Sequence, residues 1–111
     1  MVDDLARKSC VACRGDVPPL ADDAAAAYLE QTPAWALARD PMRIQRRFTF
    51  GNFREALAFV NRVGELAEAE DHHPEIHFGW GYAFIEIFTH KINGLHENDF
   101  VLAAKIDNLG Q

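Results

Sequence analysis

The sequence lacks features that several classes of protein require. It contains no run of about 20 apolar residues, the length that crosses a bilayer. Its first residues, Met1–Asp4, are acidic where a secretory signal carries basic residues before an apolar stretch. We therefore expect a protein that does not enter membranes and that stays in the cytoplasm.

Positive charge is also scarce. The chain has 11 Lys and Arg residues against 17 Asp and Glu residues, which gives a formal net charge of -6. Its single basic cluster is Arg43, Arg46 and Arg47. Binding to nucleic acid depends mostly on neutralising phosphates, so we expect no nucleic-acid partner.

Cysteine and serine are rare, which limits nucleophilic and metal chemistry. The two cysteines, Cys10 and Cys13, have the C-x-x-C spacing of a redox pair or half a zinc site. No second C-x-x-C supplies further ligands, and the pair precedes the first predicted helix. We interpret both as reduced thiols in an N-terminal arm. Ser9 is the only serine, and no Ser–His pair is evident.

The remaining composition is that of a soluble globular domain. Hydrophobic residues make up 49% and charged residues 25% of 111 residues, enough for one modest core. We interpret residues 1–19, which end in Pro18-Pro19, as an N-terminal arm, and residues 20–111 as a single domain.

Periodicity of the apolar residues predicts seven elements. They are a helix over 20–30, strands over 35–38 and 43–50, a helix over 52–70, a strand from residue 76, a strand over 82–89 and a helix over 97–108. Strand pairs joined by tight turns predict an α+β fold. We expect a four-stranded antiparallel sheet with three helices on one face, in the order α-β-β-α-β-β-α.

Three of these segments carry patterns that predict burial. The 52–70 helix has an N-cap in Asn52, with Glu55 as its capping-box partner. Strand 82–89 is apolar on both faces, which predicts a central strand or one covered by a partner. The last helix is expected to bury Leu102, Ala103, Ile106 and Leu109. The predicted buried stripe of the 52–70 helix is Phe53, Ala56, Leu57, Val60, Val63, Gly64 and Ala67.

Two adjacent histidines end the 52–70 helix and are the strongest candidates for chemistry. Pro74 disfavours helical geometry at His73. Histidine, with an unperturbed pKa of about 6.5, exchanges protons near neutrality. Glu68 precedes His72 by four residues, so a continued helix would let its carboxylate orient that imidazole. The alternative is a solvated helix end.

The histidines also allow other interpretations. His72, His73 and His77 could bind a metal, but adjacent histidines share one ion poorly and no cysteine lies nearby, so we predict no metal site. His90 ends strand 82–89, a position that commonly lines active sites. His96 is expected to be a solvated N-cap of the last helix.

Residues 68–75, Thr89-His90 and residues 94–99 together resemble the pterin-4a-carbinolamine dehydratases. Trp35 and the segments 48–50, 55–63 and 103–107 add to the resemblance. The resemblance implies the same α+β order and removal of water from 4a-hydroxytetrahydropterin, giving the quinonoid dihydropterin. The pterin would be the substrate, and no cofactor is expected.

The same resemblance implies roles for individual residues. It makes His72, His73 and His90 catalytic, with Glu68 in support, and places Trp35 and Asp99 in the pocket. Our hypothesis is metal-free acid–base catalysis in which His72 and His90 are the counterparts and His73 also binds the pterin ring. Which histidine is the acid stays open. The chain departs from the family pattern at Trp80, His96 and Asn98, which affects details of the pocket.

The resemblance also implies partners. A dehydratase of this kind would serve tetrahydrobiopterin recycling beside an aromatic amino-acid hydroxylase, and family members form homodimers and homotetramers. Two other functions stay open: a regulatory or dimerisation module without catalysis, and a histidine-based metal-binding protein.

Overall fold

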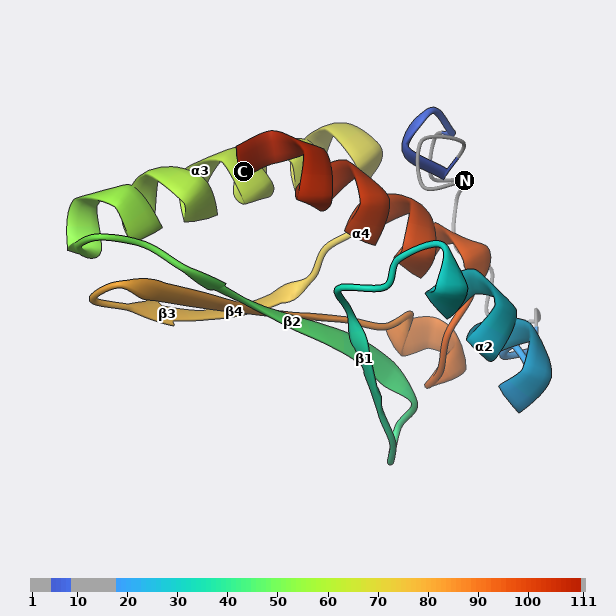
Figure 1. Cartoon of the computed structure of the whole chain (residues 1–111). Coiled ribbons are helices and arrows are strands. Elements are labelled where there is room, and N and C mark those ends of the chain that lie inside the picture. The colour runs from blue at the N-terminus through green and yellow to red at the C-terminus, as the bar shows by residue number, and fades with distance from the viewer. Residues whose placement is uncertain (1–4, 9–17, 111) are drawn as a thin grey trace.

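The computed structural model describes residues 5–8 and 18–110, and its architecture is α+β (Figure 1). Its elements are α2 (Asp22–Glu30), β1 (Ala36–Ala38), β2 (Arg43–Thr49), α3 (Phe53–Glu70), β3 (Glu75–Gly79), β4 (Tyr82–Ile87), the 3-10 helix η1 (His90–Ile92) and α4 (Glu97–Gly110). The strands form one antiparallel sheet in the order β1-β2-β4-β3. The predicted fold class and element order are confirmed, and β4 is a central strand.

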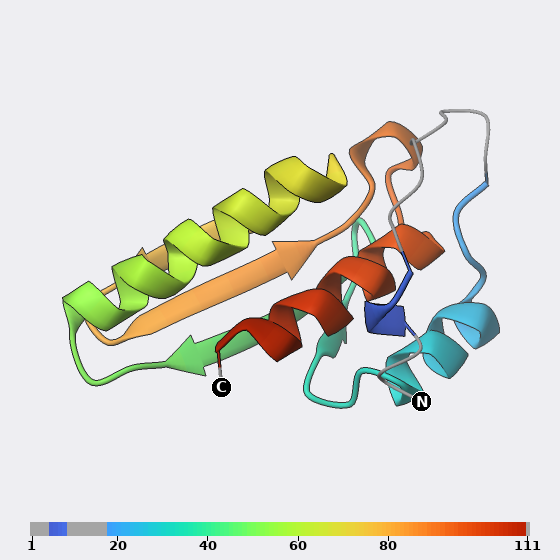
Figure 2. The same cartoon turned by 90° about the horizontal axis from the view of Figure 1, so that it is seen from above.

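The helices α3 and α4 lie side by side over one face of the sheet, and α2 packs against α4 at the end of the sheet (Figures 1 and 2). The Tyr28 and Phe100 rings stack between α2 and α4, with centroids 5.1 Å apart. Alternate residues of β4 (Ala83, Ile85, Ile87) are buried beneath the helices. The core therefore occupies the space between one sheet face and two helices, as the period-two pattern of β4 requires.

Helix α3 begins as predicted but buries a different stripe. The Oδ1 atom of Asn52 accepts a hydrogen bond from the Glu55 backbone N–H at 2.9 Å. Phe59 is fully buried because its ring packs against Phe48 and Phe50, with centroids 4.6 and 5.1 Å away. The prediction was wrong for Phe53 and Leu57, which are 46% and 38% exposed. The buried residues of α3 are Ala56, Phe59, Val63 and Ala67.

The two ends of the chain also refine the predictions. Leu5 is only 2% exposed, so residues 5–8 pack on the domain, whereas Cys10 and Cys13 lie outside the described residues. On α4, Leu102, Ala103 and Ile106 are buried as expected, but Leu109 is only partly buried. No helix within residues 5–8 and 18–110 has the length and apolar character needed to span a membrane.

Candidate active site

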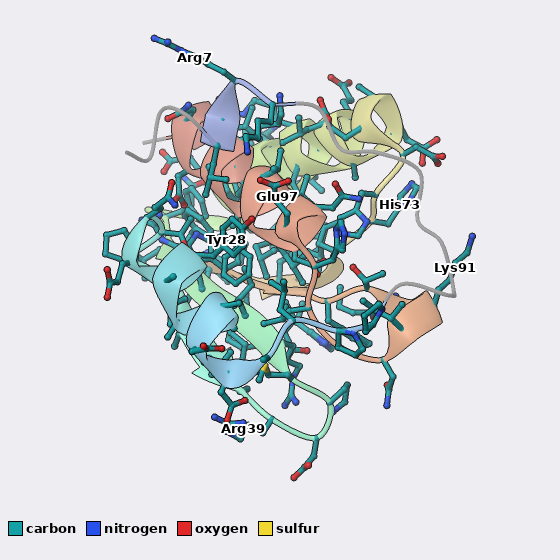
Figure 3. The ribbon with its side chains drawn as sticks, turned by 90° about the vertical axis from the view of Figure 1, so that its right-hand side faces the viewer. Arg7, Tyr28, Arg39, His73, Lys91 and Glu97 are labelled. Carbon is teal, nitrogen blue, oxygen red and sulfur yellow. The ribbon has the colours of Figure 1, made fainter. Side chains whose placement is uncertain are left out.

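Three of the predicted histidines meet at one pocket. The pocket has a volume of about 350 Å³ and is lined by two segments, residues 71–75 and 88–91. His72 and His73 come from the first segment and His90 from the second. Figure 3 views this end of the molecule and shows His73 and Lys91 toward the same edge. The structure therefore brings together the histidines that the sequence had placed 17 residues apart.

The end of α3 explains why the two adjacent histidines point in different directions. Asp71 takes a left-handed conformation with φ of 54°, and the His72 N–H reaches the Ala67 carbonyl at 3.2 Å. This is the Schellman pattern of a helix C-terminus. The helix thus stops at Glu70, four residues before Pro74. His72 is 5% exposed and turned into the protein, whereas the His73 side chain is 53% exposed.

Behind His72 lies a buried carboxylate, Asp99, that joins three parts of the fold. Its Oδ1 is 2.7 Å from His72 Nε2, and its Oδ2 accepts hydrogen bonds from the Thr89 hydroxyl at 2.9 Å and the His96 N–H at 2.8 Å. Asp99 is fully buried in the first turn of α4, where a carboxylate satisfies a free backbone N–H of the helix start. Asp99 therefore lies behind His72. It does not line the pocket, whereas the resemblance had implied that it would.

Glu68 contacts a different histidine from the one predicted. Its Oε2 lies 2.5 Å from His73 Nε2, while His72 faces Asp99. The expectation that Glu68 would orient His72 assumed that the helix continued through residue 72. The left-handed turn at Asp71 ends the helix first, so the four-residue spacing no longer aligns the two side chains.

His90 also has a carboxylate beside it. Its Nε2 is 3.3 Å from Glu75 Oε2, and its ring centroid is 4.2 Å from that of Phe88. Strand β4 ends at Ile87, and His90 is the first residue of η1. The prediction that a strand runs to Thr89 and that His90 closes it was therefore wrong. The bridge between Thr89 and Gly94 turns the chain back beside the pocket. Each of the three pocket histidines is thus next to one carboxylate.

Trp35 lies away from this pocket, in the core. It is 3% exposed, and its Nε1–H donates to Asp107 Oδ1 at 2.9 Å. Arg46 donates to the same oxygen at 2.5 Å, which explains an arginine on the apolar side of β2. Burial raises the pKa of Asp107, although the hydrogen bond from Trp35 and the Arg46 charge oppose the rise. The expectation that Trp35 lines the pocket does not fit this placement.

Sequence reasoning gave no role to several residues of the site. Thr89 was noted only as the neighbour of His90, and Glu75, Phe88 and Lys91 were not assigned to the pocket that they line. The signal available was their adjacency to the histidine motifs. His96 is the N-cap of α4, as predicted, because its Nδ1 accepts from the Asn98 N–H at 3.3 Å, and it is half-buried. Within the described part of the chain, no three His, Cys, Asp or Glu side chains are grouped to hold a metal ion.

Known proteins resemble this chain in sequence and in fold. A curated protein of Halorhodospira halophila, provisionally named pterin-4-alpha-carbinolamine dehydratase, is 58% identical over 96% of this chain and 97% of its own. A crystal structure of a transcriptional coactivator/pterin dehydratase from Brucella melitensis matches 84% of this chain and 99% of its own, with a TM-score of 0.78 and 27% identity.

A second solved structure is a pterin dehydratase-like protein identified as a RuBisCO assembly factor in the alpha-carboxysome. It matches 67% of this chain and 86% of its own at a TM-score of 0.58 and 28% identity. The profile of the family described as pterin 4 alpha carbinolamine dehydratase matches residues 18–109. The chain therefore belongs to the pterin 4 alpha carbinolamine dehydratase family.

Proposed function

We propose that this protein dehydrates 4a-hydroxytetrahydropterin to the quinonoid dihydropterin. The observation that carries the proposal is the set of three histidines around one pocket, each beside a carboxylate: His72 with Asp99, His73 with Glu68, and His90 with Glu75. A carboxylate orients an imidazole and selects its tautomer, which general acid–base catalysis requires.

The elimination needs two proton transfers and no redox step. A base removes a proton from a ring nitrogen next to C4a, and the electron pair left behind forms a carbon–nitrogen double bond. The C4a–oxygen bond breaks with its electron pair on oxygen, and an acid protonates that oxygen so that water leaves. The proton gained by the base restores the acid through solvent.

The buried position of Asp99 favours His72 as one of the two proton-transferring groups. With Nε2 donating to the carboxylate, a neutral His72 carries its acceptor on Nδ1. His90 is the counterpart across the pocket, and His73, which is exposed and held by Glu68, binds the pterin ring. No step of this scheme uses a metal ion.

The test is an assay of the purified protein with 4a-hydroxytetrahydropterin, run with and without a chelator. We expect dehydration well above the spontaneous rate, unchanged by the chelator. Absence of activity would exclude the proposal, and activity lost to the chelator would favour the metal-binding alternative. We also propose that this dehydration serves tetrahydrobiopterin recycling in the cytoplasm, beside an aromatic amino-acid hydroxylase.

A regulatory or assembly role is the second candidate. It is favoured by the two solved relatives, one described as a transcriptional coactivator and the other as a RuBisCO assembly factor. A module that only binds partners does not need the buried His72–Asp99 pair. Dehydration at the spontaneous rate by folded protein would favour this candidate over the enzyme.

We also propose that the protein is a homodimer or homotetramer. The strand β3 is at the edge of the sheet, and Phe53 and Leu57 are exposed on α3 next to it. Exposed apolar side chains beside a strand with one unpaired edge are typical of an interface. Size-exclusion chromatography with light scattering should give at least twice the 12.5 kDa chain mass, and a monomer at micromolar concentration would contradict it.

A further inference from the structure

Glu75 lines the pocket beside His90, and its own contribution to the reaction has not yet been specified. It is the first residue of β3 and directly follows Pro74. Its carboxylate Oε2 is 3.3 Å from His90 Nε2, and the Phe88 ring flanks the same imidazole. Two side chains from different segments of the pocket therefore define where the His90 ring lies.

The sheet register explains this placement. Because β3 and β4 are antiparallel with Glu75 opposite Glu86, the start of β3 lies beside the end of β4. The chain then turns back through the Thr89–Gly94 bridge, which brings His90 alongside Glu75. Glu75 and His90 are connected through the β3–β4 hairpin, and the hydrogen-bonded register of that hairpin fixes the distance between their backbones.

The neighbouring carboxylate, Glu86, is held by other groups. It accepts hydrogen bonds from Arg43 at 2.9 Å and Gln45 at 2.5 Å. Burial alone would raise the pKa of Glu86, but these two hydrogen bonds and the Arg43 charge lower it overall. Of the two facing glutamates, Glu75 is thus the one that lies beside a histidine of the pocket.

We propose that Glu75 is a positioning residue that holds the His90 imidazole, with the proton on Nε2, for transfer through Nδ1. The inference rests on the dehydratase function proposed above and assigns a residue to it. An exposed imidazole without this carboxylate samples several side-chain rotamers. The His90 and Glu75 side chains are 58% and 53% exposed, and exposed ion pairs add little to folding stability. A catalytic effect of Glu75 can therefore be separated from a loss of fold.

The kinetic test compares Glu75→Ala, His90→Ala and the double variant. We expect Glu75→Ala to lower kcat about tenfold with KM within about twofold of wild type, and its melting temperature to change by no more than about 2 °C. Because Glu75 acts through His90, the double variant should match His90→Ala alone. Glu75→Gln, whose amide oxygen still accepts a hydrogen bond, should recover part of the lost rate.

The matched control is Glu30→Ala, which removes an exposed glutamate at the end of α2 and should leave kcat unchanged. A kcat for Glu75→Ala within twofold of wild type would overturn the inference. So would a loss that adds in full to that of His90→Ala.

A second measurement does not depend on activity. Three-bond scalar couplings of the His90 side chain should report one χ1 rotamer in the wild type and an average over rotamers in Glu75→Ala. Identical couplings in both proteins would overturn the inference even if the wild type is an active dehydratase. If the wild type is inactive while the couplings differ, the proposed function fails but the positioning by Glu75 stands.

Discussion

Helix α4 carries two carboxylates, Asp99 and Asp107, that each accept several hydrogen bonds but from donors of different charge. Both accept hydrogen bonds from residues outside α4, and they lie eight residues, about 12 Å, apart along the helix. Asp107 is paired with a permanent cation, Arg46, and with the Trp35 indole. Asp99 accepts hydrogen bonds from an imidazole, a hydroxyl and a backbone amide.

We interpret the Asp107 network as structural and the Asp99 network as part of the candidate site, because only the second includes a residue of the pocket. The Arg46 guanidinium neutralises Asp107 permanently, and none of the three residues lines the histidine pocket. Among the three donors to Asp99, His72 is the one with an ionisable side chain, and it lines the pocket. Under the proposed function, a buried carboxylate next to a histidine of the pocket distinguishes the candidate site better than burial alone.

The largest effect expected is that of Asp99→Asn on turnover. If the amide oxygen keeps the hydrogen bonds from Thr89 and His96, the new NH2 group faces His72 Nε2, which must then give up its proton to accept. His72 would change tautomer, and we expect kcat to fall about 100-fold, with the protein still folded. Stopped-flow dehydration assays and circular dichroism measure both. A kcat near that of the wild type would remove the distinction between the two carboxylates.

Asp107→Asn should have the opposite profile. The amide oxygen can still accept from Trp35, but the ion pair with Arg46 is lost in a partly buried site, at a cost of about 2 kcal/mol of unfolding free energy. Because the network lies away from the pocket, kcat should stay within about threefold of wild type. Urea denaturation and the dehydration assay provide the comparison, and a loss of turnover as large as that of Asp99→Asn would contradict it.

Trp35→Phe tests which of the two regions Trp35 belongs to. Phenylalanine fills most of the same core space but cannot donate to Asp107, so we expect a loss of about 1 kcal/mol of stability. KM for the pterin should not change, since Trp35 does not line the pocket. A raised KM at unchanged stability would restore Trp35 as a substrate-binding residue.

The smallest effect is a pH dependence of stability due to Asp107. Its pKa in the folded protein is raised above the unfolded value, 3.8, mainly by burial. The native state then binds the proton more tightly, so the contribution of Asp107 is fully present below 3.8 and decreases as pH rises through the folded pKa. The stability difference between wild type and Asp107→Asn should therefore be larger near pH 4 than at about pH 7. An equal difference at both pH values would contradict the raised pKa.

Local patterns predicted the fold well, and the site only in part. The two apolar faces of strand 82–89 predicted a central or partner-covered strand, and β4 is central; the N-cap at Asn52 predicted the start of α3. The end of α3 at Glu70 agrees with the prediction, but the left-handed turn at Asp71 was not predicted, and this turn places His73 instead of His72 beside Glu68. The placement of Asp99 behind His72 depends on contact between α4 and the loop after α3, which neither segment signals alone. Trp35 was assigned to the pocket by resemblance, whereas its indole N–H lies beside Asp107.

The central claim is that a pocket histidine backed by buried Asp99 eliminates water from the pterin. The most direct test is kcat for 4a-hydroxytetrahydropterin dehydration by His72→Ala beside the wild type, with the melting temperature of both. The account predicts a loss of about 100-fold or more in kcat while the variant still unfolds cooperatively. A folded His72→Ala protein that dehydrates the pterin at the wild-type rate would contradict it.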